Sequence, residues 1–298
     1  MVVSDEALAR ECLERVGYYR LSGYWYPFRA SRTAIVGGRE VRCIEDTFRP
    51  GTEFRHAMEL YVFDKQLRML FLDAIERIEV AIRVDIALLL GQRNPIAHRS
   101  ADQLHGNFTR LSTRTGKVGH ADWLRRLDDQ MARSKDDFVA HFKRTYSTPL
   151  PIWIAIELWD FGMLATFFAG MKFLDRTLIA QKYGLRYEVL ESWLYTLNHI
   201  RNICAHHSRL WNRTLWAQPK WTKNGEVPSL DHLVGDTQRQ SRMYAAAAIS
   251  QFLLGTVNPQ TQWSSRFRNH VATLPVAPGV SVSQMGIPAN WTSLALWT

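Results

Sequence analysis

The sequence predicts an all-α fold. Apolar residues recur at spacings of three and four over most of the chain, which is the period of an amphipathic helix. Residues 52–91 also carry acid–base pairs four residues apart with the acid first, the orientation that supports a helix. With 298 residues, of which 46% are apolar and 12% aromatic, the chain can bury a large core in one large or two modest domains.

The first expected elements lie before residue 92. A short helix over residues 4–17, with Ser4 as a candidate cap, precedes the aromatic segment GYYRLSGYWYPFR. Residues 31–50 contain Gly37 and Gly38 among β-branched residues, and we expect a loop or a small hairpin there. Residues 52–91 then form one long helix or a kinked pair. Its acid–base pairs, which we expect to stabilise an exposed face, are Asp64/Arg68, Asp73/Arg77 and Glu79/Arg83.

A polar, turn-rich stretch over residues 93–120 separates these elements from the later helices. The later helices share the same apolar spacing and are expected at residues 121–145, 150–171, 173–183, 187–214, 236–255 and near 260–273. We expect residues 1–218 to form the main helical domain, including the aromatic segment. Residues 219–298 would form a helical extension packed on the same core.

The charge balance favours a polyanionic partner. The chain has 37 basic and 28 acidic residues, a formal charge of +9, and most of its basic residues are arginines. Arginine binds phosphate with a planar fork and stacks on bases, so nucleic acid is favoured over a membrane. An arginine excess also arises from a GC-rich genome, and composition alone does not separate the two explanations.

Several other classes of protein are disfavoured. The three cysteines indicate a reducing compartment, and no Cys/His cluster has zinc spacing. No Gly-rich phosphate loop or hydrolase motif occurs, so we expect neither a metal nor another cofactor. The N-terminal residues lack a secretory apolar core, and the apolar stretch YAAAAISQFLLGTV is too short to span a membrane. We therefore expect a soluble cytoplasmic protein.

The stretch RNICAHHSRLWNR, residues 201–213, is the strongest candidate site. On a helical wheel its polar arc holds Arg201, Asn202, Ala205, His206, Arg209, Asn212 and Arg213. The apolar arc holds Ile200, Ile203, Cys204, His207, Leu210 and Trp211. His206 is thus expected in the site and His207 in the core. Arg201 and His206 lie about 140° apart, so one helix offers a wide half-site that a second copy of the chain could complete.

A second Arg-x4-His pair, Arg93 to His98, occurs in RNPIAH. Pro95 interrupts a helix at that point, and a turn-rich stretch follows. We therefore expect no site there.

Residues 201–213 resemble the signature of the abortive-infection AbiD/AbiF-like proteins of the HEPN superfamily. The hallmark of that family is Arg, then four to six residues, then His, with a polar residue after the Arg. Three other blocks are also similar, in the order of the family: GYYRLSGYWYPFR, PLPIWIAIELWDFGMLATFF and MGIPANWTSLALW. The resemblance implies a HEPN-type helical bundle with additional N-terminal and C-terminal helical elements. It also implies metal-independent RNA cleavage at a composite site in a homodimer, with an anti-phage or toxin-like role.

The residue types suit that chemistry, because the 2′-hydroxyl of RNA can itself attack the adjacent phosphate. His206 would transfer protons, Arg201 would stabilise the developing charge, and Asn202 would orient either partner. The predicted RNA-binding residues are Arg209, Arg213, Arg20, Tyr24, Trp25 and Arg29. The aromatic side chains among them would stack on unpaired bases or, alternatively, fill the helical core. Two other functions stay open, a non-catalytic scaffold for a structured non-coding RNA and a protein-interaction module in defence signalling.

Overall fold

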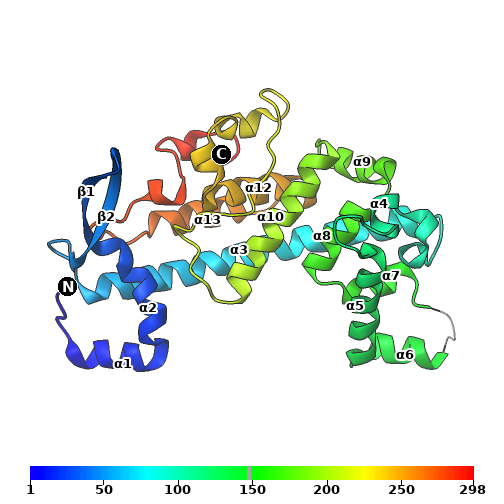
Figure 1. The fold of residues 1–298 in the computed structure, drawn as a ribbon, viewed down its shortest axis with the longest axis horizontal. Coiled ribbons are helices and arrows are strands. Elements are labelled where there is room, and N and C mark those ends of the chain that lie inside the picture. The colour runs from blue at the N-terminus through cyan, green and yellow to red at the C-terminus, as the bar shows by residue number, and fades with distance from the viewer. Residues whose placement is uncertain (146–148) are drawn as a thin grey trace.

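The computed structural model describes residues 1–145 and 149–298, and it is mostly helical, as predicted (Figure 1). Its axis is the long helix α3 (Phe54–Gly91), whose 38 residues span about 57 Å at 1.5 Å per residue. Of the two alternatives expected for this region, one long helix or a kinked pair, the structure has the single helix. In Figure 1 the N-terminal elements gather at one end of α3 and helices α4 to α9 at the other, while α12 and α13 lie along it.

The N-terminal end consists of two short helices and a hairpin. Helix α1 (Glu6–Val16) is capped by Asp5, whose carboxylate accepts from Leu8 N–H at 2.9 Å, so the expectation that Ser4 caps it is wrong. Helix α2 (Tyr18–Trp25) packs against α3. Strands β1 (Arg29–Val36) and β2 (Arg39–Phe48) then pair antiparallel. Of the loop or small hairpin expected here, the structure has the hairpin. Its turn residues Gly37 and Gly38 both have positive φ, as a tight hairpin turn requires.

The other helices form two groups. At the far end of α3 lie α4 (Gly106–Thr109), α5 (Gly119–Arg133), α6 (Asp137–Thr145), α7 (Ile152–Ala155), α8 (Phe161–Gly170) and α9 (Phe173–Lys182). Helix α10 (Tyr187–Ala205) packs against α3, α8 and α9. The chain then adds α11 (Thr237–Gln240), α12 (Met243–Val257) and α13 (Trp263–Ala272). Short 3₁₀ turns are at Tyr26–Phe28, Ala97–Arg99, Ala101–Gln103, Ile156–Leu158, Pro228–Leu233, Val282–Met285 and Trp291–Ser293.

Several helices are shorter than the apolar spacing predicts, because polar side chains start new elements inside the expected ranges. The expected helix 150–171 is interrupted before Asp160, whose carboxylate accepts from Met163 N–H at 3.0 Å and caps α8. The expected helix 121–145 is interrupted at Ser134, which has extended backbone and a side chain bonded to Asp136. Asp236 caps α11 in the same way, and the chain leaves the helical conformation before α12 begins.

One hydrophobic core joins the two ends of the sequence. Buried side chains of α3 at spacings of three and four meet α2, α10, α12 and α13. The C-terminal segment adds a packed aromatic group of Tyr244, Trp263, Phe267, Trp291 and Trp297. Residues from both sides of position 218 share this core, while the domain boundary at 218 stays a prediction. No helix in the described ranges has both the length and the apolar character needed to cross a bilayer.

Candidate active site

Helix α10 ends at Ala205, one residue before the first of the two adjacent histidines. Ser208 N–H donates to the carbonyl of Ile203 at 2.9 Å, and His207 N–H donates to that of Cys204 at 3.1 Å. These two bonds form a Schellman motif, which places His207 at the position where a left-handed residue ends a helix. His207 accordingly has a φ of 56°, a conformation usually taken by glycine.

The helical wheel therefore fails beyond residue 205. His206 and His207 are both exposed, so the expectation that His207 lies in the core is wrong. The chain turns away from the helix axis at His207, and its imidazole leaves the apolar arc. Leu210 and Trp211 are fully buried as expected, but the loop that follows the turn, and not the continued helix, carries them inside.

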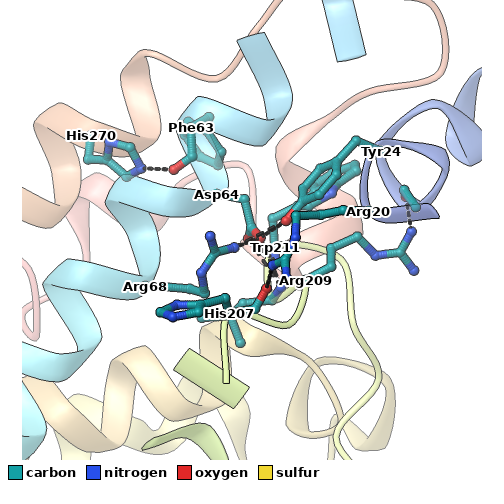
Figure 2. A network of polar contacts seen from close by, with 11 residues as sticks. Arg20, Tyr24, Phe63, Asp64, Arg68, His207, Arg209, Trp211 and His270 are labelled. Carbon is teal, nitrogen blue, oxygen red and sulfur yellow. Dashed lines mark hydrogen bonds and ion pairs between the residues drawn. The ribbon is translucent and has the colours of Figure 1, made fainter. Parts of the chain in front are cut away.

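A buried carboxylate holds this loop against α3 (Figure 2). Asp64 accepts from Leu210 N–H at 3.2 Å and from Trp211 N–H at 2.7 Å. It also accepts from the Tyr24 hydroxyl at 2.7 Å and forms an ion pair with Arg68. The side chains of Asp64 and Arg68 are almost fully buried, so the expectation that this pair stabilises an exposed face is wrong for it. The pair instead joins α2, α3 and the loop after α10.

Burial governs the protonation of this network. It raises the pKa of the Asp64 carboxyl, while Tyr24, Arg68 and the two backbone amides oppose the shift. It also raises the pKa of the Tyr24 phenol, with the Asp64 charge adding to the effect. The pKa of the Cys204 thiol rises to about 12, chiefly through burial. Cys204 is thus a protonated core residue at neutral pH and not a nucleophile.

Two arginine–carbonyl contacts fasten α2 to the loop. Arg20 of α2 donates to the backbone carbonyl of His207 at 2.9 Å, and Arg209 of the loop donates to that of Gly23 in α2. Helix α2 and the loop thus each donate an arginine hydrogen bond to a backbone carbonyl of the other. Burial lowers the pKa of Arg209, and its neighbour Arg213 adds to the shift.

A basic pocket of about 680 Å³ lies at this junction. None of the eleven described residues that line it is acidic. Arginine and histidine side chains thus face a hollow whose described lining contains no carboxylate, an arrangement that attracts anions. The lining residues are Val16, Gly17, Tyr19, Arg20, Gly23, Tyr24, His206, His207, Ser208, Arg209 and Arg213.

The three residues predicted as catalytic do not meet in one hollow of a single chain. His206 lines the basic pocket. Arg201 lines a different hollow beside α3, together with Glu76 and Glu79. Its charge is close enough to Glu79 to oppose the rise in the pKa of that carboxyl caused by burial. Asn202 accepts from Arg201 at 3.4 Å and lines a third hollow on α10.

The residues predicted to bind RNA divide into two groups. Arg20, Arg209 and Arg213 converge on the basic pocket. Tyr24 and Trp25 are 2% and 6% exposed, so their rings fill the core, which was the alternative for the aromatic segment. Arg29 begins β1, pairs with Asp46 at 2.7 Å and does not line the pocket.

Sequence reasoning missed one residue of the pocket and one residue that holds the adjoining loop. Tyr19, a 91% exposed lining residue, belongs to the aromatic segment but was not among the residues predicted to bind RNA. Asp64 was assigned to an exposed face, although its pairing with Arg68 was expected. The roles of Tyr19 and Asp64 follow from the turn at His207 and from the packing of α2 on α3. Neither the turn nor the packing has a local sequence signal.

The second Arg-x4-His pair is engaged in structural contacts. Arg93 forms a two-pronged ion pair with Asp175, at 3.0 and 2.7 Å. His98 is fully buried, and burial lowers its pKa to about 3. Its imidazole is therefore neutral and inaccessible to RNA, so the pair offers no site for RNA chemistry.

Within residues 1–145 and 149–298, no group of three or more His, Cys, Asp or Glu side chains is placed to hold a metal ion.

A family model described as Abi-like protein matches residues 11–212, about two thirds of the chain. The match begins in α1 and extends past α10, so it includes nearly all residues of the basic pocket. No curated protein and no solved structure matches the chain significantly.

Proposed function

Because this chain belongs to the Abi-like protein family, we propose that it acts in abortive infection as a metal-independent endoribonuclease. The observation that carries the proposal is the basic pocket at the end of α10. It combines an exposed histidine, His206, with Arg20, Arg209 and Arg213, and none of its described lining residues is acidic. A phosphodiester is the anion that RNA would present to such a surface.

The cleavage step needs only proton transfer and charge stabilisation. The 2′-hydroxyl of one nucleotide loses its proton and attacks the adjacent phosphorus, and the bond to the 5′-oxygen of the next nucleotide breaks. That oxygen takes up a proton, which leaves a 2′,3′-cyclic phosphate and a 5′-hydroxyl. His206 exchanges these protons, and the guanidinium groups stabilise the charge that builds on the phosphate oxygens.

The complete site would contain residues of two chains. In one chain Arg201 lies beside Glu79 and apart from the basic pocket, so a single copy does not bring Arg201 to the phosphate held at His206. A two-fold pair of α10 ends would place Arg201 of one copy near His206 of the other, with Asn202 between them. A row of exposed apolar residues on α3, of which Met69 lines the same hollow as Arg201, would provide the surface for such a pair. Its members are Val62, Met69, Val80, Val84 and Leu88.

The test is a cleavage time course on single-stranded and structured RNA with excess EDTA. We expect cutting to continue, because no step uses a metal, and products that end in a cyclic phosphate. His206→Ala should lower the rate about 10²- to 10⁴-fold, the usual contribution of a general acid–base group. His141→Ala serves as the control, because His141 is exposed on α6, at the opposite end of α3 from the pocket (Figure 1). Loss of all cutting on chelation, or full activity of His206→Ala, would exclude this mechanism.

A second candidate is a scaffold that binds a structured RNA without cutting it. The separation of Arg201 from the pocket of His206 favours it, because one chain alone does not assemble the catalytic pair. Salt-sensitive RNA binding without cleavage would support the scaffold. If RNA is neither bound nor cut, the basic pocket would instead serve an acidic protein partner in defence signalling.

A further inference from the structure

A second hollow, of about 390 Å³, lies between α10 and residues 216–220. It differs from the basic pocket in the chemistry of its walls. Aromatic rings and side-chain amides dominate it, contributed chiefly by Tyr195, Asn198, His199, Asn202, Trp216 and Gln218. Its volume lies within the range of small-ligand sites. Asn202 belongs to the motif of the proposed nuclease, so the hollow adjoins that site on the same helix.

The outer wall of this hollow is held firmly in place. Thr196 donates to the carbonyl of Ala217 at 3.2 Å, and Trp193 donates to that of Lys220 at 2.8 Å. Ser192 accepts from Lys220 N–H at 2.8 Å. Three residues of α10 thus fix both ends of the segment that follows Trp216. A preformed wall lowers the conformational entropy that a ligand must remove on binding.

Trp216 and His199 lie side by side in the lining of the hollow. Trp216 is 78% exposed, although burial of a large apolar side chain normally stabilises a protein by about 1.5–3 kcal/mol. Its ring stands edge-on to the His199 ring, with centroids 4.7 Å apart. Its exposed surface is therefore available to a second flat ring.

The His199 ring, which contacts Trp216, carries an unpaired polar atom. Its Nε2 is buried and has no hydrogen-bond partner among the described residues, which is unfavourable as long as it stays unpaired. Burial lowers the pKa of His199, and the nearby Arg213 charge adds to the effect. The neutral ring offers one donor and one acceptor nitrogen, as the edge of a nucleobase requires.

The charges around the hollow disfavour a phosphate. Glu188 and Glu191 belong to its described lining, which contains no arginine and only one cation, Lys220. Arg176 neutralises Glu191 through an ion pair at 2.6 Å. A neutral, planar ligand with hydrogen-bonding edges fits these walls better than an anion does.

We propose that this hollow binds one unpaired base of RNA, stacked on Trp216, with its polar edge facing His199 and Asn202. The inference rests on the proposed function and names the specificity pocket of the same site. Asn202 lies four residues before His206, about 6 Å along the helix. The base therefore belongs to a nucleotide adjacent to the phosphate in the basic pocket. Bases of single-stranded RNA are commonly bound by stacking on aromatic rings together with contacts to their edges.

The experiment compares the binding of RNA probes that carry bases with the binding of a probe that carries none. The probes cannot be cleaved. The probes are short 2′-O-methylated oligoadenylate, oligocytidylate and oligouridylate, and a chain of the same length without bases. Anisotropy gives the Kd of each probe for the full-length protein. We expect at least one base-bearing probe to bind about 5- to 100-fold more tightly than the abasic chain, as stacking of a base on an aromatic ring provides.

Trp216→Ala should abolish this preference and leave binding of the abasic chain unchanged. Trp153→Ala is the matched control, because Trp153 is 50% exposed on α7 and lies outside the hollow. His199→Phe keeps a ring beside Trp216 but removes both nitrogens, and it should weaken the preference only in part. Equal binding of all probes by the wild type, or an unchanged preference in Trp216→Ala, would overturn the base pocket.

The two proposals fail in different ways. If RNA is cut but Trp216→Ala keeps its base preference, the nuclease stands and the pocket does not. If the preference depends on Trp216 but RNA is not cut, the pocket stands as part of a scaffold and the nuclease does not. If the wild type binds none of the probes, both proposals fall.

Discussion

His207 is the only non-glycine residue with positive φ in the described ranges, and it lies next to the histidine proposed to transfer protons. An L-residue in this conformation is strained by about 1–2 kcal/mol, and such strain often lies at functional sites. The bond from Arg20 to the His207 carbonyl holds the strained turn in place. The turn directs both histidines outward, and His206 reaches the basic pocket as a result.

We expect His207→Gly to raise the free energy of unfolding by about 0.5–1 kcal/mol. Glycine removes the left-handed strain, and its greater entropy in the unfolded chain offsets part of that gain. Urea unfolding provides the measurement. His206→Gly is the control, because His206 has a negative φ of −88°, so glycine relieves no left-handed strain there and should destabilise the protein. A marked loss of stability in His207→Gly would mean that the imidazole itself stabilises the fold.

The end of α10 could not be predicted from the sequence, because the residue that ends the helix is a histidine. Helix ends of this type usually carry Gly or Asn, and neither occurs between Ala205 and Trp211. The apolar spacing continues through Leu210 and Trp211, so it predicts a helix that the chain does not form. The exposure of His206 was predicted correctly, whereas that of His207 depends on the turn.

At the scale of elements, Asp64 connects three segments that are distant in sequence. Its carboxylate in α3 binds Tyr24 of α2 and the amides of Leu210 and Trp211. The sequence predicts α3 and the pairing of Asp64 with Arg68, because both follow from local spacing. It does not predict that the pair is buried, since burial depends on which elements pack over that turn of the helix.

Asp64→Ala should lower the free energy of unfolding by about 3–5 kcal/mol, because it leaves Arg68 buried without its counter-charge and two amides without an acceptor. Asp122→Ala breaks an ion pair with Arg125 that is largely exposed and should cost less than about 1 kcal/mol. Chemical denaturation of the two variants tests the contrast. Similar small effects would show that the buried network contributes little to stability.

The helices at the far end of α3 enclose His98 and make stability depend on pH. Its pKa is about 3 in the folded protein and near 6.5 in an unfolded chain. Between these pH values the unfolded state binds a proton that the folded state does not. The contribution of the neutral, buried His98 to the free energy of unfolding is therefore complete only above about pH 6.5. That contribution declines by up to about 1.4 kcal/mol per pH unit as the pH falls toward 3.

We therefore expect the Tm to fall on acidification from neutral pH, and His98→Leu to reduce the slope. Burial also lowers the pKa of His120, His232 and His270, so these residues act in the same direction. The difference between the melting curves of wild type and variant across this pH range isolates His98. Parallel curves would mean that His98 is protonated in the folded state.

At the scale of the whole molecule, α3 is covered along most of its length but leaves one apolar stripe exposed. On a wheel Val62, Met69, Val80, Val84 and Leu88 fall within an arc of about 100°, which they share with the ion pair of Asp73 and Arg77. Exposed apolar residues that gather on one face are typical of partner-binding sites. The sequence suggested a second copy from the wide half-site of Arg201 and His206, but only the packing of the other helices shows which face of α3 stays open.

We expect this stripe to be the surface that joins two copies of the chain. At micromolar concentration, light scattering should give about twice the chain mass of 34.5 kDa. Met69→Glu together with Val80→Glu should yield a folded monomer, because each copy would bring two carboxylates without partners into the interface. Val276→Glu is the control, since Val276 is 97% exposed and lies outside the stripe. The engineered monomer should also lose RNA cleavage while it keeps part of its RNA binding, because the basic pocket lies within one chain but Arg201 must come from the other. A monomeric wild type that cuts RNA would exclude the composite site and leave His206 with the arginines of its own pocket as the catalytic group.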